Sequence, residues 1–304
     1  MTWRLKKGVL LGIVSLTWIL GPSALADVRA FACEPEWAAL LQELAGDKAT
    51  IYTATTAQQD PHHVEARPSF IAKARRADII VCSGADLEGG WLPLLLRTSG
   101  NNKIQLSQAG YFEAAMQVHR LEIPERLDRA LGDIHAAGNP HVHLDPRRLS
   151  VIADALSKRL LEIDPEYASY YRQRLADFSQ RWQAAIDRWS QRAAPLRGKT
   201  AVVHHRDWSY LFDWLGIKEV GQLEPKPGIP PTASHLATLK QQLAATPPDF
   251  ILYTPHQSAK AANWLAEHSG GRAIMLPYTI GGDTAAQDLF RLFDITLDRL
   301  LQTP

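Results

Sequence analysis

The middle of the chain contains the stretch DPEYASYYRQRLADFSQRWQAAIDRWSQRAAP, residues 164–195. Asp164 is a favourable N-cap residue, and the proline after it suits the first helical position because no backbone N–H is needed there. From Tyr167 to Ala194 neither glycine nor proline interrupts the chain. This predicts one helix of about 28 residues and about 40 Å, at about 1.5 Å per residue. A helix of this length, ended by Pro195, predicts a spacer between two lobes.

Short apolar runs alternate with helix-like stretches on both sides of this helix. We expect strands at 28–33, 50–53, 77–82, 200–204, 250–253 and 273–276, and helices at 36–44, 69–76, 91–97, 233–243, 260–268 and 285–301. This alternation is typical of parallel sheets covered by helices, so the sequence predicts an α/β fold with two Rossmann-like lobes joined by one long helix. The expected division is a signal peptide at 1–26, an N-terminal lobe at 27–164, the linking helix at 165–195 and a C-terminal lobe at 196–304.

The amino terminus has the pattern of a secretory signal peptide. A basic head containing Arg4, Lys6 and Lys7 precedes an apolar run at 8–20, and an Ala-Leu-Ala sequence at 24–26 precedes the expected cleavage site. The apolar run is shorter than the about 20 residues that a helix needs to cross a bilayer. We therefore expect a periplasmic protein secreted with a cleaved signal peptide, and the alternative is a retained membrane anchor.

Charge and cysteine content exclude several classes of protein. The 33 Lys and Arg against 32 Asp and Glu give a net charge of +1. No excess of basic residues is present for a nucleic-acid-binding protein that depends on phosphate contacts. Two cysteines cannot form a tetrathiolate zinc site. Cys33 and Cys82 each end an apolar run and could form a disulfide in an oxidising compartment. Two buried thiols, or lipidation of Cys33, are the alternatives.

The 11 histidines of the chain include three clusters, at 60–69, 138–146 and 203–208. Each cluster lies where a predicted strand or loop leads into a helix, and ligands bind at such positions in open α/β folds. Three imidazoles supply most of a tetrahedral Zn²⁺ shell. The clusters therefore predict a metal site in the cleft between the lobes. We expect metal binding to weaken as the pH falls towards about 6.5, because protons compete for the imidazole nitrogens.

The three clusters resemble the motifs of one family, the metal-binding solute-binding proteins of ABC transporters, in its zinc-uptake (ZnuA-like) branch. The matching segments are Asp60-Pro-His-His-Val-Glu-Ala-Arg-Pro-Ser69, Asn139-Pro-His-Val-His-Leu-Asp-Pro146 and Val203-His-His-Arg-Asp-Trp-Ser-Tyr210. The resemblance implies that His62, His141 and His205 bind a zinc ion. It also implies that the protein delivers this ion to the membrane permease of an ABC transporter. The expected protein is a monomeric carrier, which is not an enzyme and does not bind nucleic acid.

The fourth ligand is where the chain departs from the family pattern. Many relatives carry an aspartate in the turn after the last strand, and Tyr278 stands near that position here. Asp283 follows a few residues later and is our candidate metal ligand, with the N-cap of the last helix as its other interpretation. Glu65 or water are the alternatives for completing the shell. The resemblance makes His63, His143 and His204 neighbours of the ligands, with an outer or metal-recruiting role as one interpretation, and the roles of these three residues and of His135 stay open.

Two other functions fit part of the pattern. A manganese or iron carrier of the same family would share the fold, but a third histidine in place of a carboxylate favours zinc. A zinc-dependent hydrolase would share three histidines and an open position. The chain has no His-Glu-x-x-His segment, and no carboxylate is obviously placed as a general base. We therefore expect a carrier and not an enzyme.

Overall fold

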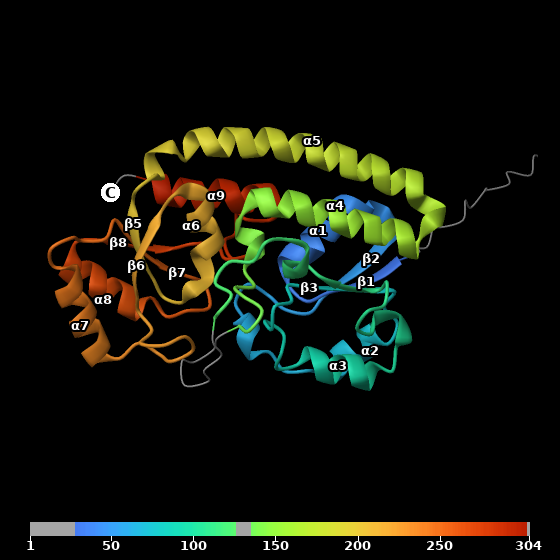
Figure 1. The fold of residues 1–304 in the computed structure, drawn as a ribbon, viewed down its shortest axis with the longest axis horizontal. Helices are drawn as coiled ribbons and strands as arrows, with labels where there is room; N and C mark the ends of the chain where they lie inside the picture. The colour runs from blue at the N-terminus through green and yellow to red at the C-terminus, as the bar shows by residue number, and fades with distance from the viewer. Residues whose placement is uncertain (1–27, 126–134, 303–304) are drawn as a thin grey trace, which may run out of the picture.

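The computed structural model describes residues 28–125 and 135–302, so the predicted signal peptide at 1–26 lies outside the described residues. Two α/β lobes lie side by side, and a layer of long helices runs over both of them (Figure 1). The predicted α/β architecture with two parallel sheets and one long helix is confirmed.

The first lobe is built on a parallel four-stranded sheet with the strand order β2-β1-β3-β4. Its strands are β1 (Val28–Ala32), β2 (Ala49–Thr53), β3 (Ile79–Cys82) and β4 (Tyr111–Glu113). Its helices are α1 (Pro35–Ala45), α2 (Pro68–Ala74) and α3 (Leu92–Ser99). The four residues of β3 are all buried, as expected for an inner strand with helices on both faces.

The second lobe repeats this topology, with a parallel sheet in the order β6-β5-β7-β8. Its strands are β5 (Thr200–Val203), β6 (Lys218–Gln222), β7 (Phe250–Tyr253) and β8 (Arg272–Met275). Its helices are α6 (Ser209–Leu215), α7 (Ala233–Leu243), α8 (Ala259–Ser269) and α9 (Leu289–Leu301). In each lobe the second strand lies on one side of the first strand and the third strand lies on the other side. The carboxyl ends of the two central strands, β1 and β3 in one lobe and β5 and β7 in the other, therefore form a topological switch point, where open α/β folds bind ligands.

The lobes are joined by α4 (Pro146–Ile163) and α5 (Ala168–Arg192), with a short 3-10 turn at Pro165–Tyr167 between them. The predicted long helix therefore begins and ends within two residues of α5. Trp182 donates its indole N–H to the carbonyl of Pro146 at 2.8 Å, and Trp189 donates to Asp294 of α9 at 2.8 Å. A single stripe of α5 is buried, formed by Tyr171, Phe178, Trp182, Ala185, Ile186 and Trp189. One apolar core thus includes this stripe and residues of both lobes, so α5 is held along its length.

Two edge strands and one helix were not predicted, namely β4, β6 and α6. β6 is Lys-Glu-Val-Gly-Gln and pairs only with β5, so it needs no continuous apolar run. The last helix begins at Leu289 and not at 285, because the Asp288 side chain accepts a hydrogen bond from the backbone N–H of Arg291 at 2.7 Å. The alternative interpretation of Asp283, as the N-cap of this helix, is therefore wrong.

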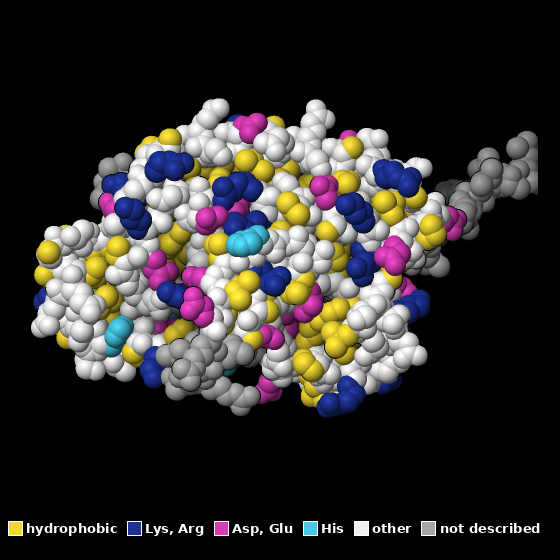
Figure 2. Space-filling model, in the orientation of Figure 1, with side chains coloured by type: hydrophobic (Ala, Val, Ile, Leu, Met, Phe, Trp, Pro, Cys, Tyr) yellow, Lys and Arg dark blue, Asp and Glu magenta, His cyan; other side chains and the backbone are white. Residues whose placement is uncertain are grey.

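Basic and acidic side chains are interspersed on the face shown in Figure 2, and neither sign forms one continuous patch there. Among the described residues, no helix combines the length and apolar character that crossing a bilayer requires.

Candidate metal centre

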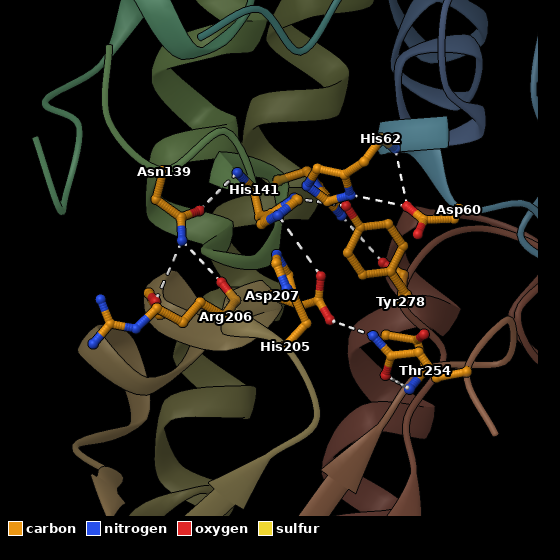
Figure 3. Close-up of polar contacts among 12 residues, drawn as sticks. Asp60, His62, Asn139, His141, His205, Arg206, Asp207, Thr254 and Tyr278 are labelled. Carbon is orange, nitrogen blue, oxygen red and sulfur yellow. Dashed lines mark hydrogen bonds and ion pairs between the residues drawn. The ribbon is translucent and has the colours of Figure 1, made fainter. Parts of the chain in front are cut away.

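Three histidines from the three sequence clusters come together between the lobes (Figure 3). His62 lies in the 3-10 turn that follows β2, and His141 lies just before the turn that leads into α4. His205 follows β5 in the other lobe. Their ligand atoms all lie within 4.8 Å of one another. Parallel strands end at a common edge of each sheet, and this brings loops that are distant in sequence to one place.

Each of the three rings has an oxygen atom beside its Nδ1. The pairs are His62 with Asp60 (2.9 Å), His205 with Glu224 (2.8 Å), and His141 with the hydroxyl of Tyr278 (2.6 Å). An oxygen partner on one ring nitrogen fixes the orientation of an imidazole and leaves the other nitrogen for a metal. The Nε2 of His62 is buried and has no hydrogen-bond partner within the described structure. The three Nε2 atoms are therefore the free ligand atoms of the cluster.

Asn139 connects the loops of the two lobes at this site. Its Oδ1 accepts a hydrogen bond from the backbone N–H of His141 at 3.0 Å, and its Nδ2 donates to the carbonyl of Arg206 at 2.9 Å (Figure 3). One side chain thus holds the backbone beside two of the three clustered histidines. This contact explains why an asparagine belongs to the second sequence motif.

The charge state of the cluster is set by its surroundings. Burial alone would lower the pKa of His205, but the hydrogen bond to Glu224 and the charge of Asp207 raise that pKa to about 9. Burial, together with the neighbouring rings of His62 and His135, lowers the pKa of His141 well below its usual range. At neutral pH and without metal, His205 carries a proton and His141 is neutral.

The remaining histidines of the clusters have separate places. His135 has its ring centre 5.2 Å from that of His62, and its Nε2 is buried without a hydrogen-bond partner among the described residues. His143 is fully buried, with its Nε2 3.1 Å from the carbonyl oxygen of Tyr278. His63 is exposed, and His204 is buried with its Nε2 4.0 Å from a carboxylate oxygen of Glu224. Of these four, only His135 approaches the cluster with an unpaired nitrogen and a ring close to His62.

A cavity of about 540 Å³ opens beside the cluster. Its lining includes His135, His141 and His205, with Pro225 and Pro227 on the side of the second lobe. Space for solvent and small solutes therefore lies directly beside these rings.

The structure does not bring Asp283 to the three histidines. Its carboxylate accepts a hydrogen bond from the backbone N–H of Ala285 at 2.7 Å and forms an ion pair with Arg299 of α9. Glu65 is exposed and is likewise outside the group of clustered ligand atoms. Neither carboxylate considered as the fourth ligand lies at the site.

The residues that sequence reasoning missed are those beside the rings. Asp60 and Asp207 belong to the quoted motifs, so their proximity to the histidines was a usable signal. Glu224 and Tyr278 lie outside the three motifs, and only the fold brings them to the rings.

Cys33 and Cys82 form a disulfide that joins the ends of β1 and β3. Glu88 lies beside them, and the two sulfur atoms with this carboxylate form a second group of metal-ligand type. Because the disulfide occupies both sulfurs, this group does not provide thiolate ligands.

Comparison with known proteins gives a consistent family assignment. The family model described as zinc-uptake complex component A, periplasmic (ZnuA), matches residues 31–303. The zinc-binding lipoprotein AdcA of Streptococcus pneumoniae serotype 4 is 24% identical over 235 residues, which are 77% of this chain and 46% of AdcA. The chain therefore spans about half the length of this relative. The manganese ABC transporter substrate-binding lipoprotein PsaA of Streptococcus pneumoniae is 24% identical over 213 residues, 68% of this chain and 65% of PsaA.

Solved structures share the fold. A crystal structure of ZnuA superimposes with a TM-score of 0.75 at 20% identity, covering 90% of this chain and 98% of that one. At this level of identity the likeness concerns the arrangement of the two lobes and the helices over them.

Proposed function

This chain belongs to the ZnuA family, the periplasmic component A of zinc-uptake complexes, and on that premise we propose that it captures zinc outside the cytoplasm and delivers it to the membrane permease of an ABC importer. Members of this family are substrate-binding components of transporters, so the role we propose is that of a carrier and not an enzyme. We further propose that the signal peptide at 1–26 is cleaved, that the mature protein is periplasmic and that it acts as a monomer.

The observation that carries this proposal is the convergence of His62, His141 and His205, with ligand atoms within 4.8 Å of one another. Each ring is oriented by an oxygen atom on its Nδ1, and an Nε2 donor with such a partner is typical of zinc sites. Three imidazole nitrogens from two lobes can enclose an ion and release it again if the lobes separate. We propose these three residues as zinc ligands.

The choice of zinc over manganese rests on ligand chemistry. Imidazole nitrogen suits zinc, whereas manganese favours sites richer in carboxylate and carbonyl oxygen. The name of PsaA makes manganese the second candidate. Three histidines in the cluster favour zinc for this chain.

The proposal is tested by titrating the metal-stripped protein with zinc and, separately, with manganese. We expect tight binding of zinc and weaker binding of manganese. His62→Ala, His141→Ala and His205→Ala should each lose tight zinc binding. His119→Ala is the matched control, because His119 is exposed and is not part of the cluster. If two of the three cluster variants still bound zinc as the unmodified protein does, the ligand assignment would be refuted.

A further inference from the structure

Asp207 is a buried carboxylate beside the three histidines. It lies in the 3-10 turn Arg206–Trp208, and only 2% of its surface is exposed. Its Oδ1 is 3.7 Å from the Nε2 of His141, and its Oδ2 accepts a hydrogen bond from the side chain of Gln257 at 3.1 Å (Figure 3). One oxygen of this carboxylate is thus held by an amide, while the other faces a proposed zinc ligand.

The carboxylate has no cationic partner from lysine or arginine within the described ranges 28–125 and 135–302. The closest basic side chain to it is that of His141, whose Nε2 lies 3.7 Å from Oδ1, and both side chains are almost fully buried. An ionised carboxylate that is removed from water is costly unless a cation or several hydrogen bonds compensate for it. A divalent metal ion between His141 and Asp207 would supply that compensation.

The spacing of the two atoms also fits metal binding. Zinc bonds of about 2.0–2.1 Å in a tetrahedral shell place neighbouring ligand atoms about 3.3 Å apart. The observed 3.7 Å between His141 Nε2 and Asp207 Oδ1 is close to this value. A direct hydrogen bond between the two atoms would be shorter than this distance. Asp207 is outside the group of atoms that all lie within 4.8 Å of one another, so its carboxylate must move towards the other two rings when the ion binds.

The other carboxylates near the site are already engaged. Asp60 and Glu224 hold the Nδ1 atoms of two of the rings, and Asp283 is paired with Arg299. The turn after β8 contributes the hydroxyl of Tyr278, which is bonded to His141. Among residues 28–125 and 135–302, Asp207 is the carboxylate with an oxygen within 4 Å of the Nε2 of one of the three clustered histidines.

We propose that Asp207 is the fourth zinc ligand, binding the ion through Oδ1 while Oδ2 stays hydrogen-bonded to Gln257. This inference rests on the proposed function, because it assumes that the three histidines bind the ion. Two of the four zinc ligands, His205 and Asp207, then lie two residues apart in the second lobe. The segment after β8 contributes only the hydroxyl group of Tyr278, which orients His141.

The test uses the mature protein loaded with Co²⁺, whose visible spectrum reports on its ligands, together with zinc titrations. Asp207→Ala removes the ligand and opens one position on the metal. We expect zinc affinity to fall by more than the about 10- to 100-fold that loss of an outer hydrogen-bonding partner costs. We also expect added azide to change the cobalt spectrum of this variant and to leave that of the unmodified protein unchanged.

Glu224→Gln is the control for loss of charge. It removes a carboxylate that touches His205 but does not face the free ligand atoms, so its cobalt form should stay insensitive to azide. Asp207→Asn serves if the alanine variant does not fold, since its amide keeps the shape and can still bond to Gln257. A zinc-bound crystal structure should place Asp207 Oδ1 about 2.0–2.2 Å from the ion.

The inference is overturned if the Asp207 variants bind zinc as tightly as the unmodified protein and are insensitive to azide, or if the crystal structure places Oδ1 beyond 3 Å from the ion. Azide sensitivity in His135→Ala in place of the Asp207 variants would assign the fourth position to His135. The proposed function itself fails only if the unmodified protein does not bind zinc or the three histidine variants bind it normally. The two failures are therefore distinct.

Discussion

Replacing Glu224 by glutamine should change the number of protons released when zinc binds. In the metal-free protein, the hydrogen bond to Glu224 and the charge of Asp207 outweigh burial and raise the pKa of His205 to about 9. His205 is therefore protonated at pH 7, and zinc must displace that proton. Because one pKa unit corresponds to about 1.4 kcal/mol, the proton weakens apparent affinity about 100-fold at pH 7 relative to a fully deprotonated ring, and about 50-fold relative to pH 9. Zinc affinity should thus rise with pH up to about 9, a higher limit than the value near 6.5 expected for unperturbed imidazoles.

Glu224→Gln removes the carboxylate that holds this proton. Burial then dominates, the pKa of His205 falls, and the ring is mostly neutral in the metal-free variant at pH 8. Isothermal titration calorimetry in two buffers of different ionisation enthalpy counts the released protons. At pH 8 we expect about one proton for the unmodified protein and less than half of one for the variant. Glu65→Gln, an exposed carboxylate of the first motif, is the matched control and should behave as the unmodified protein.

Equal proton counts in Glu224→Gln and in the unmodified protein would refute this reasoning. An affinity of the unmodified protein that does not change between pH 7 and pH 9 would refute it as well. Either result would mean that His205 is already neutral when zinc arrives.

Three further results are expected. Zinc at about 100 to 1,000 times its dissociation constant should raise the free energy of unfolding by about 2.7–4.1 kcal/mol in urea titrations, and His62→Ala should abolish this gain. The Cys33–Cys82 disulfide closes a loop with a sequence separation of 49, so the double serine variant should lose about 4 kcal/mol in the same assay, and an unchanged midpoint would contradict this. Burial raises the pKa of Glu88 to about 7, so the stability that this group contributes is present below about pH 4.5 and is lost as the pH rises through about 7. Thermal unfolding at pH 5 and pH 8 should therefore show a smaller difference for Glu88→Gln than for the unmodified protein.

Much of the fold could be predicted from local patterns. The long helix 167–194 was visible because it lacks glycine and proline over a length that no loop would have, and α5 occupies nearly the same residues. Inner strands such as β7 were visible because burial on both faces demands a continuous apolar run. The edge strands β4 and β6 were missed because Tyr-Phe-Glu and Lys-Glu-Val-Gly-Gln contain no apolar run, whereas the edge strands β2 and β8 contain one and were predicted.

The sequence alone determined which histidines stand at the ends of strands and loops, because strand–loop–helix order is a local property and His62, His141 and His205 lie inside short motifs. Which oxygen atoms meet those rings was decided only by the tertiary structure. Asp283 stands close in sequence to Tyr278, yet its carboxylate is paired with Arg299, while Tyr278 and Glu224 reach the rings from other parts of the chain. A side chain a few residues away along the chain can point into another part of the molecule, so the packing of the two lobes, and not sequence distance, selected the groups that orient the histidines.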